Sequence, residues 1–503
     1  MMYGEEKSDS LIVAANLANN PQGAESVERR SGAKGNAEQP HMRRTQSRES
    51  MSQRLSRVRE AAKQRKKERF TALFHLLTAE ALENAFLSLS RKAAAGVDGV
   101  RWKDYAENLK VNIADLHRRL HQGSYRAQPG RRHYIPKADG KQRPLGIASL
   151  EDKIVQYALV KILNAVYEND FMGFSYGFRP GRSQHNALDA LATGLVRTNV
   201  NWVLDADISQ FFDKVSHEWL IRFIEHRIGD QRVIRLIRKW LTAGTSEEGE
   251  WRASEEGEWR ASEEGTPQGA VISPLLANIY LHYVFDLWAH QWRRRHATGN
   301  VVMVRYADDI VIGFDKRIDA QCFRIAMQRR LKEFGLTVHP KKTRLTEFGR
   351  FAAENRASRG KGKPETFNFL GFTHISGKDR SGRFMLIRKT RRGRMTATLK
   401  AIKDGLRKRW HYSIPEQGKW LRRVVQGYLN YHSVPGNYPM MRKFRIYVTD
   451  LWRRALRRRS QQDDTTWTKA NRLAAVWLPK VRVLHPWPVE RFTARHPRQE
   501  PGA

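Results

Sequence analysis

A short segment of the chain, residues 303–314, has the pattern of two β-strands joined by a tight turn. Its two apolar runs are rich in β-branched residues and flank a polar break that contains Asp308 and Asp309, which is typical of a hairpin. Adjacent carboxylates repel each other, and burying either of them without a counter-charge is costly. A bound Mg²⁺ ion would resolve both problems, because Mg²⁺ takes hard oxygen ligands. The other interpretation is an ordinary hairpin whose Asp-Asp turn is solvated.

A second apolar strand earlier in the chain also ends in a carboxylate. Residues 202–207 begin as a buried strand and end in Asp207. If the two strands pair in one sheet, their ends come together, and so do Asp207 and Asp308. This is the arrangement that a two-metal site requires.

The charge of the chain indicates a polyanionic partner. Its 503 residues include 91 Lys and Arg against 52 Asp and Glu, a formal charge of +39 at pH 7, which points to nucleic acid or an anionic membrane surface. No apolar run approaches the roughly 18 residues of a membrane span, and no secretory signal opens the sequence. The single cysteine, Cys322, excludes an internal disulfide and a Cys-cluster zinc site. We therefore expect a soluble intracellular nucleic-acid-binding protein and no membrane association.

The pattern changes several times along the chain. Residues 1–55 are polar with little periodicity, and we expect a disordered tail there. A helical pattern runs from about 54 to 93 and is broken by Gly96–Gly99. Residues 461–503 contain Pro, Trp and Arg and are weakly structured by pattern.

Residues 132–147 read as a hairpin that turns at Asp139-Gly140 and carries cations on both arms. Lys137, Lys141 and Arg143 either protect a solvated sheet edge or converge on phosphates. The sequence alone leaves both interpretations open.

Residues 246–265 contain an internal repeat of eight residues. The segment 246–253 recurs word for word as 254–261, and a third copy begins at Ser262. Identity of this kind indicates a duplication in a tolerant surface loop and not a solenoid, whose repeats are longer.

The region from about 390 to 460 is helical by pattern and strongly basic. Between residues 401 and 460 there are 15 Lys and Arg against three Asp and Glu. Apolar stripes alternate with basic faces, so these helices are expected to pack on each other and to present Arg to phosphates. The arginines concerned are Arg453, Arg454, Arg457, Arg458 and Arg459. A solvated basic face is the other interpretation.

Taken in order, the motifs resemble those of a reverse transcriptase encoded by a bacterial group II intron, also called an intron maturase. The similarity covers roughly residues 60–460. It rests on Ile135-Pro136-Lys137, Arg143-Pro144-Leu145-Gly146-Ile147, Tyr176-Gly177-Phe178-Arg179-Pro180, Asp205-Ala206-Asp207-Ile208-Ser209, Gly265-Thr266-Pro267-Gln268-Gly269, Ser273-Pro274-Leu275-Leu276-Ala277-Asn278, Tyr306-Ala307-Asp308-Asp309 and Phe369-Leu370-Gly371-Phe372.

The resemblance implies an α+β right-hand polymerase with an antiparallel palm sheet. Fingers and palm would span 56–385, a helical thumb or maturase domain 386–460, and a basic tail 461–503. Asp207, Asp308 and Asp309 would be the palm carboxylates, with Asp207 and Asp308 the foremost ligands of two Mg²⁺ ions and the carbonyl of Ile208 a further one. One ion would lower the pKa of the primer 3′-hydroxyl, and the other would hold the triphosphate.

The resemblance also implies roles for other residues. Lys137 and Arg143 would contact the triphosphate, Gln268 would lie by the nucleotide and template, and Phe212 would exclude a 2′-hydroxyl. Tyr306 would support the primer end. Arg179, Arg182 and Lys342 would contact the primer or template.

The expected function is RNA-directed DNA synthesis together with binding of intron RNA to assist splicing and mobility. The expected partners are group II intron RNA, an RNA template with a DNA primer or target DNA, and dNTPs, in the bacterial cytoplasm near the nucleoid. Many relatives continue into a Cys- and His-bearing endonuclease, which is not expected here. Two alternatives remain: an RNA-binding splicing cofactor with an idle polymerase, and a reverse transcriptase of the retron, diversity-generating or defence kind.

Overall fold

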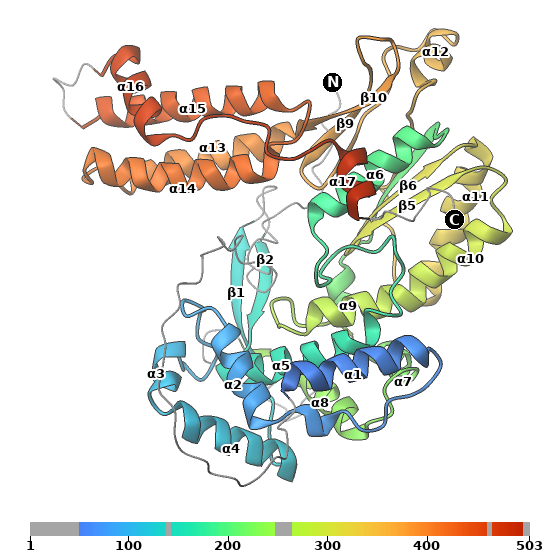
Figure 1. The fold of residues 1–503 in the computed structure, drawn as a ribbon, viewed down its shortest axis with the longest axis vertical. Coiled ribbons are helices and arrows are strands. Elements are labelled where there is room, and N and C mark those ends of the chain that lie inside the picture. The colour runs from blue at the N-terminus through green and yellow to red at the C-terminus, as the bar shows by residue number, and fades with distance from the viewer. Residues whose placement is uncertain (1–49, 137–141, 247–263, 460–464, 496–503) are drawn as a thin grey trace, which may run out of the picture.

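The protein combines helices with largely antiparallel sheets, which is the α+β class expected from the sequence. The computed structural model describes residues 50–136, 142–246, 264–459 and 465–495. Within these residues, three sheets are surrounded by helices and followed by a helical bundle (Figure 1). The expected N-terminal tail up to residue 49 and most of the repeat, residues 247–263, lie outside the described residues.

The central sheet has four antiparallel strands in the order β5-β6-β3-β7. The strands are β3 (Trp202–Asp207), β5 (Val301–Tyr306), β6 (Asp309–Phe314) and β7 (Arg344–Glu347). β5 and β6 form the hairpin predicted for residues 303–314, and β6 also pairs with β3 so that Asp207 lies opposite Asp309. The prediction that the two acidic strand ends adjoin in one sheet is confirmed.

Both faces of the central sheet are covered by helices. These are α5 (Leu150–Tyr167), α6 (Gln184–Arg197), α7 (His217–Glu225), α9 (Ser273–Leu281), η4 (His282–Asp286), α10 (Leu287–Arg295) and α11 (Arg317–Glu333). Successive strand side chains point to opposite faces, so Leu204 and Ile310 join the large core with α5, α9 and α11. Val203 and Val311 join a second core with α6. Burial on both faces explains why these strands read as continuous apolar runs.

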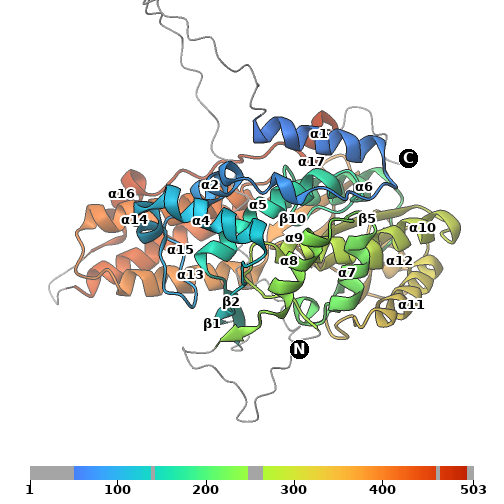
Figure 2. The ribbon, with the colours of Figure 1, turned by 90° about the horizontal axis from the view of Figure 1, so that it is seen from below.

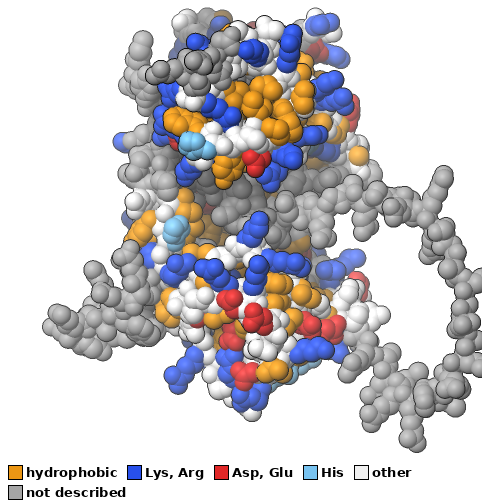
Figure 3. Space-filling model, turned by 90° about the vertical axis from the view of Figure 1, so that its left-hand side faces the viewer, with side chains coloured by type: hydrophobic (Ala, Val, Ile, Leu, Met, Phe, Trp, Pro, Cys, Tyr) orange, Lys and Arg blue, Asp and Glu red, His pale blue; other side chains and the backbone are white. Residues whose placement is uncertain are grey.

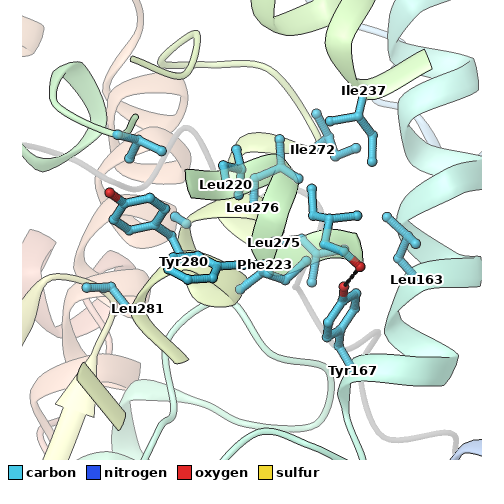
Figure 4. Close-up of a cluster of buried hydrophobic side chains, with 14 of the residues drawn as sticks. Leu163, Tyr167, Leu220, Phe223, Ile237, Ile272, Leu275, Leu276, Tyr280 and Leu281 are labelled. Carbon is cyan, nitrogen blue, oxygen red and sulfur yellow. Dashed lines mark hydrogen bonds between the residues drawn. The ribbon is translucent and has the colours of Figure 1, made fainter. Parts of the chain in front are cut away.

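Part of the large core is drawn in Figure 4, where side chains from α5, α7 and α9 interlock. The Tyr167 hydroxyl donates to the Ile224 carbonyl at 3.2 Å. Burial therefore costs this tyrosine no hydrogen bond.

The N-terminal part consists of helices that pack against α5. They are α1 (Met51–Gln64), η2 (Phe74–Leu76), α2 (Ala79–Ser88), α3 (Trp102–Glu107) and α4 (Leu109–Gln122). The continuous helical pattern expected over 54–93 is interrupted between α1 and α2. Phe70 there exchanges backbone hydrogen bonds with Arg227 and Gly229, so a distant partner has overridden the local preference for helix.

The structure also contains two smaller sheets. β1 (Gly130–Pro136) and β2 (Gln142–Ile147) form the expected basic hairpin, and β4 (Thr245–Ser246) pairs with β1 in parallel. The second small sheet contains β8 (Phe367–Phe369), β9 (Phe372–Lys378) and β10 (Phe384–Thr390). The remaining short elements are η3 (Phe211–Asp213), α8 (Gln231–Thr242) and α12 (Ala352–Ala357).

The last part of the chain is a helical bundle with its own core. It comprises α13 (Arg392–Arg407), α14 (Ile414–His432), α15 (Tyr438–Arg457) and α16 (Trp467–Trp477). Figure 2 shows the bundle at one end of the molecule and α10–α12 at the other. The chain then returns to α6 through α17 (Pro488–Arg495). The expectation of weak structure beyond residue 460 is therefore wrong for residues 465–495.

A fully buried ion pair ties the central sheet to the helices behind it. Arg305 of β5 and Asp286 at the end of the π-helical turn η4 both have 0% exposed side chains, and their atoms are 2.6 Å apart. The guanidinium also donates to the Asn278 side chain, the Ser175 hydroxyl and the Ala307 carbonyl. Three segments, the α9–η4 helix, the loop at Ser175 and the β5–β6 turn, therefore converge on one guanidinium.

Asp286→Asn should lower the free energy of unfolding by roughly 3–5 kcal/mol, because it leaves the buried charge of Arg305 uncompensated. The measurement is urea denaturation followed by circular dichroism. Asp404→Asn is the matched control, because Asp404 pairs with Arg407 at 3.9 Å on an exposed helix face. Loss of this exposed pair should hardly change the free energy of unfolding. Equal effects of the two substitutions would contradict a central role for this pair.

Candidate active site at the β5–β6 turn

The turn between β5 and β6 is held in a strained conformation by its surroundings. Ala307 has a φ of 56°, which is unfavourable for a residue with a Cβ. Its carbonyl accepts from Arg305 at 3.0 Å. Gly177 lies against the same backbone so closely that a Cβ there would come within 2.2 Å of the Ala307 nitrogen, and Asn278 fixes the Gly177 carbonyl at 2.7 Å.

Three aspartates gather at this end of the sheet. Asp207 and Asp309 are direct partners across β3 and β6, so their side chains share one face of the sheet. Asp308 lies in the turn itself and is half-buried. The register therefore places Asp309, and not Asp308, directly opposite Asp207.

Lys342 supplies a positive charge to this acidic end. Its Nζ is 3.4 Å from Oδ2 of Asp207, and only 15% and 10% of the two side chains are exposed. The loop that carries Lys342 is anchored to the end of β3, because His339 N donates to the Asp207 carbonyl and Ser209 N donates to the Thr337 carbonyl. A cation is thus held next to the buried carboxylate, as its burial requires.

A second group of predicted residues lies together beside β2. Phe212, in η3, is half-buried and packs edge-on against Phe211 at 5.4 Å. Gln268 donates to the Asp213 carboxylate at 2.9 Å, and its carbonyl accepts from Gly146 N of β2 at 2.6 Å. The β1–β2 hairpin, η3 and the Gln268 loop therefore converge, although they lie far apart in the sequence.

This arrangement agrees with a comparison against protein families. Residues 135–374 match the family model described as reverse transcriptase (RNA-dependent DNA polymerase). The chain carries a reverse transcriptase domain. All three aspartates, Phe212 and Gln268 fall within the matched residues.

Curated relatives agree with the family match. The chain is 36% identical over 231 residues to the group II intron-encoded protein LtrA of Lactococcus lactis, which is 45% of this chain and 37% of LtrA. It is 41% identical over 214 residues to protein YkfC of Escherichia coli, 42% of this chain and 54% of YkfC. Over 401 residues it is 26% identical to the putative COX1/OXI3 intron 1 protein of Saccharomyces cerevisiae, 66% of this chain and 46% of that protein. The chain thus spans about half, or less, of the length of these relatives.

Reverse transcriptases use divalent metal ions, and the oxygen donors at this turn fit such an ion. The donors are the paired carboxylates of Asp207 and Asp309 with Asp308 beside them, which are the hard ligands that Mg²⁺ prefers. Lys342 already shows that a cation is accommodated against Asp207. Although the three aspartates lie at one end of the sheet, no three His, Cys, Asp or Glu side chains within the described ranges are arranged as a metal site.

Lys137 and Arg143 are the two residues expected to contact the triphosphate of the nucleotide. Lys137 lies outside the described residues. The backbone of Arg143 belongs to β2, where it pairs with Ile135. Their expected contact with a triphosphate stays a prediction.

The expected contact of Arg179 with a template does not agree with where its side chain lies. The Arg179 side chain is 2% exposed and paired with Glu168 at 3.0 Å, and it also donates to the Ser175 carbonyl. Arg182 donates to the Gly173 carbonyl and lies over the Tyr176 ring, and burial lowers the pKa of its guanidinium. Both arginines hold the 168–182 segment together. Arg182 is half-buried, and its expected contact with a template stays a prediction.

Tyr306 lies directly before the turn and is buried against Phe178, with ring centroids 6.3 Å apart. Burial raises the pKa of its hydroxyl to about 12. The side chain is therefore neutral and can only donate or accept a hydrogen bond.

The bundle arginines differ from one another in exposure. Arg453 is paired with Asp450 at 3.0 Å and lies over the Trp467 ring. Arg454 shares the same carboxylate but is 69% exposed. Arg457 and Arg458 are exposed on the same helix.

Several residues of this site carry no sequence motif that singles them out. Arg305 is an arginine inside an apolar strand, and Asp286 is an acidic residue inside an apolar helix. A charged residue within a buried element is a signal of a partner elsewhere, but it does not identify that partner. Only the fold brings the two together.

Gly177→Ala should displace the turn, because the added Cβ meets backbone atoms that cannot move away. We expect a loss of about 1–3 kcal/mol of unfolding free energy and a marked loss of primer extension. Gly173→Ala is the control, because a Cβ there meets nothing within 4 Å. If the two variants extend primers equally, the close packing of Gly177 is not needed to hold the β5–β6 turn in its active position.

Proposed function

We propose that this protein is an RNA-directed DNA polymerase of the group II intron type, which also binds intron RNA. The observation that carries the proposal is the pairing of Asp207 with Asp309 at the ends of adjacent strands, with Asp308 in the turn between β5 and β6. The match of residues 135–374 to reverse transcriptases supports it. The activity itself is tested by extension of a DNA primer on an RNA template.

In this proposal the molecule is a right hand. The central sheet is the palm, α1–α4 with the β1–β2 hairpin are the fingers, and α13–α15 are the thumb. The arrangement in Figure 1 supports this division, because the bundle and the β1–β2 hairpin lie on the same side of the central sheet. Primer and template would then be held between them.

Asp207, Asp308 and Asp309, with the Ile208 carbonyl, would hold two Mg²⁺ ions that lower the pKa of the primer 3′-hydroxyl and neutralise the triphosphate. Lys342 would offset the charge of Asp207 while the site is empty of substrate.

The group beside β2 would bind the incoming nucleotide. Phe212 is fixed by its backbone, since its carbonyl accepts from Thr266 N at 2.7 Å, so its ring can exclude a 2′-hydroxyl by contact. The Gln268 side chain is held by its hydrogen bond to Asp213. In this position Gln268 would lie beside the nucleotide and the template. Lys137 and Arg143, on the two arms of the hairpin, would bind the triphosphate.

The bundle would bind intron RNA and support splicing. Asp450 is the only acidic residue between Glu416 and Asp463, and it is already paired with Arg453 and Arg454. Over the upper part of Figure 3, which is the bundle, Lys and Arg side chains outnumber acidic ones. Phosphate is the partner that suits such a surface.

Asp308→Ala should reduce DNA synthesis by roughly 10²–10³-fold or more, because it removes a carboxylate that would hold the Mg²⁺ ions, and these ions would stabilise the negative charge of the reacting phosphate. Binding of intron RNA should stay nearly unchanged, since one acidic residue contributes little to a chain of charge +39. Primer extension and filter binding measure the two effects, with Asp404→Ala as control. Parallel loss of both activities would refute the separation of catalysis from RNA binding.

Replacement of Arg454, Arg457 and Arg458 by Gln should weaken RNA binding and flatten its salt dependence. Each lost phosphate contact changes the slope of log K against log salt by about 0.7–0.9, so a flattening of roughly two units is expected. The control replaces Lys316, Arg329 and Lys332, which are exposed at or near α11, with Gln. An unchanged slope in the bundle variant would mean that this basic face is only solvated.

A further inference from the structure

The chain does not stop at the bundle but crosses back to the opposite domain. We call residues 478–495, which follow α16 and end with α17, the return segment. It begins at Leu478, which is buried in the bundle core, and ends on α6, beside the central sheet (Figure 1). No residue of this segment belongs to the site described above.

The first half of the return segment is bound to the bundle. Backbone nitrogens of Leu484 and His485 both donate to the Ser433 carbonyl, at 3.0 and 3.1 Å. The His485 ring is 2.7 Å from the Asn430 carbonyl through Nε2. These contacts fix the segment to the end of α14.

The second half is bound to α6 by charge. Arg491 binds the Asp189 carboxylate through two nitrogens, one of them at 2.9 Å. Asp189 is 1% exposed and also lies 3.6 Å from Arg388 of β10. Without Arg491 the carboxylate would face one poorly aligned arginine, because that distance is too long for a good hydrogen bond.

His485 connects the two halves and must be neutral to do so. Arg491 Nη1 lies 2.7 Å from Nδ1 of His485, and a guanidinium can only donate, so Nδ1 accepts. Nε2 then carries the hydrogen and donates to Asn430. The His485 ring also packs against that of His185 at 4.0 Å.

The α6 end of this contact is close to the catalytic turn. His185 is the second residue of α6, and α6 packs against β5, the strand that ends in Tyr306. His185 also packs against Tyr431 of α14 at 5.1 Å. The bundle, the return segment and α6 therefore meet at His185, on the helix that packs against β5.

We propose that the return segment is a clasp that holds the bundle against α6, and that Arg491 and His485 are positioning residues which fix the thumb relative to the catalytic turn. This rests on the proposed polymerase function. With the clasp closed, the thumb keeps one distance from the palm and retains the primer–template between additions. With the clasp open, each nucleotide addition proceeds, but the primer–template leaves sooner.

Arg491→Gln removes both arms of the contact and should open the clasp. The measurement follows the dissociation of a fluorescent RNA–DNA primer–template after unlabelled duplex is added in excess. We expect the dissociation rate to rise about tenfold, because mutations that weaken a complex act mainly on its dissociation rate. The rate of single-nucleotide addition at saturating duplex should stay within about twofold of the wild type. Hydrogen exchange in residues 484–495 should increase.

Two further variants make the result specific. Arg482→Gln removes the same charge from an exposed position of the return segment and should change none of these quantities. Arg491→Lys keeps the charge without the two-armed bond, and it should give an intermediate dissociation rate. It also serves if Arg491→Gln does not fold.

The dissociation rate of the wild type should also depend on pH. Burial lowers the pKa of His485 from 6.5. The charged groups that face it are Arg491, Arg388 and Asp189, and the His185 ring beside it is neutral because burial lowers its pKa to about 2. The closed clasp therefore favours neutral His485. The contribution of His485 to the stability of the closed clasp is complete above about pH 6.5 and is lost as the pH falls below that value. Dissociation should accelerate between about pH 7.5 and 5.5 in the wild type but not in Arg491→Gln, where the clasp is already open.

Faster hydrogen exchange in Arg491→Gln with an unchanged dissociation rate would overturn the proposal, and so would equal behaviour of Arg491→Gln and Arg482→Gln. A wild type that adds no nucleotide would refute the polymerase function instead. The clasp would still be judged by duplex dissociation, which needs no catalysis.

Discussion

The buried guanidinium of Arg305 is the interaction on which the catalytic end of the sheet depends. It forms an ion pair with Asp286 and donates hydrogen bonds to the Asn278 side chain, the Ser175 hydroxyl and the Ala307 carbonyl. A charge with 0% exposure is tolerated only when every donor has a partner. Removing one partner would therefore loosen the helix pair behind the sheet and the turn in front of it together.

The same network explains how an unfavourable backbone conformation is kept at the turn. A positive φ at Ala307 costs on the order of 1–3 kcal/mol, and the surrounding contacts over-determine it. Gly177 closes the space on one side, and Arg305 fixes the carbonyl on the other. The three aspartates are thus presented by a rigid turn and not by a flexible loop, which is what a site for phosphate chemistry needs.

The sequence predicts the parts of this protein that depend on local pattern. The β5–β6 hairpin and the strand ending at Asp207 are predicted because β-branched runs and turn residues act within a few positions. Arg179 shows where such reasoning fails, since its motif suggests a template contact while Glu168 and backbone carbonyls occupy it. The return segment was missed because its short helix is stabilised by contacts with α6 and α14, and these partners cannot be read from periodicity.

The return segment also has a consequence for how the molecule is assembled. Arg491 contacts a residue 302 positions earlier in the chain, so α6 is synthesised long before the residue that completes it. At roughly 5–20 residues per second, the ribosome needs about 15–60 s to cover that distance. During this interval the surface of α6 around Asp189 remains open to solvent and to other chains. The contact between Arg491 and Asp189 can therefore form only after nearly the whole chain has been synthesised, and until then other chains can compete for this surface of α6.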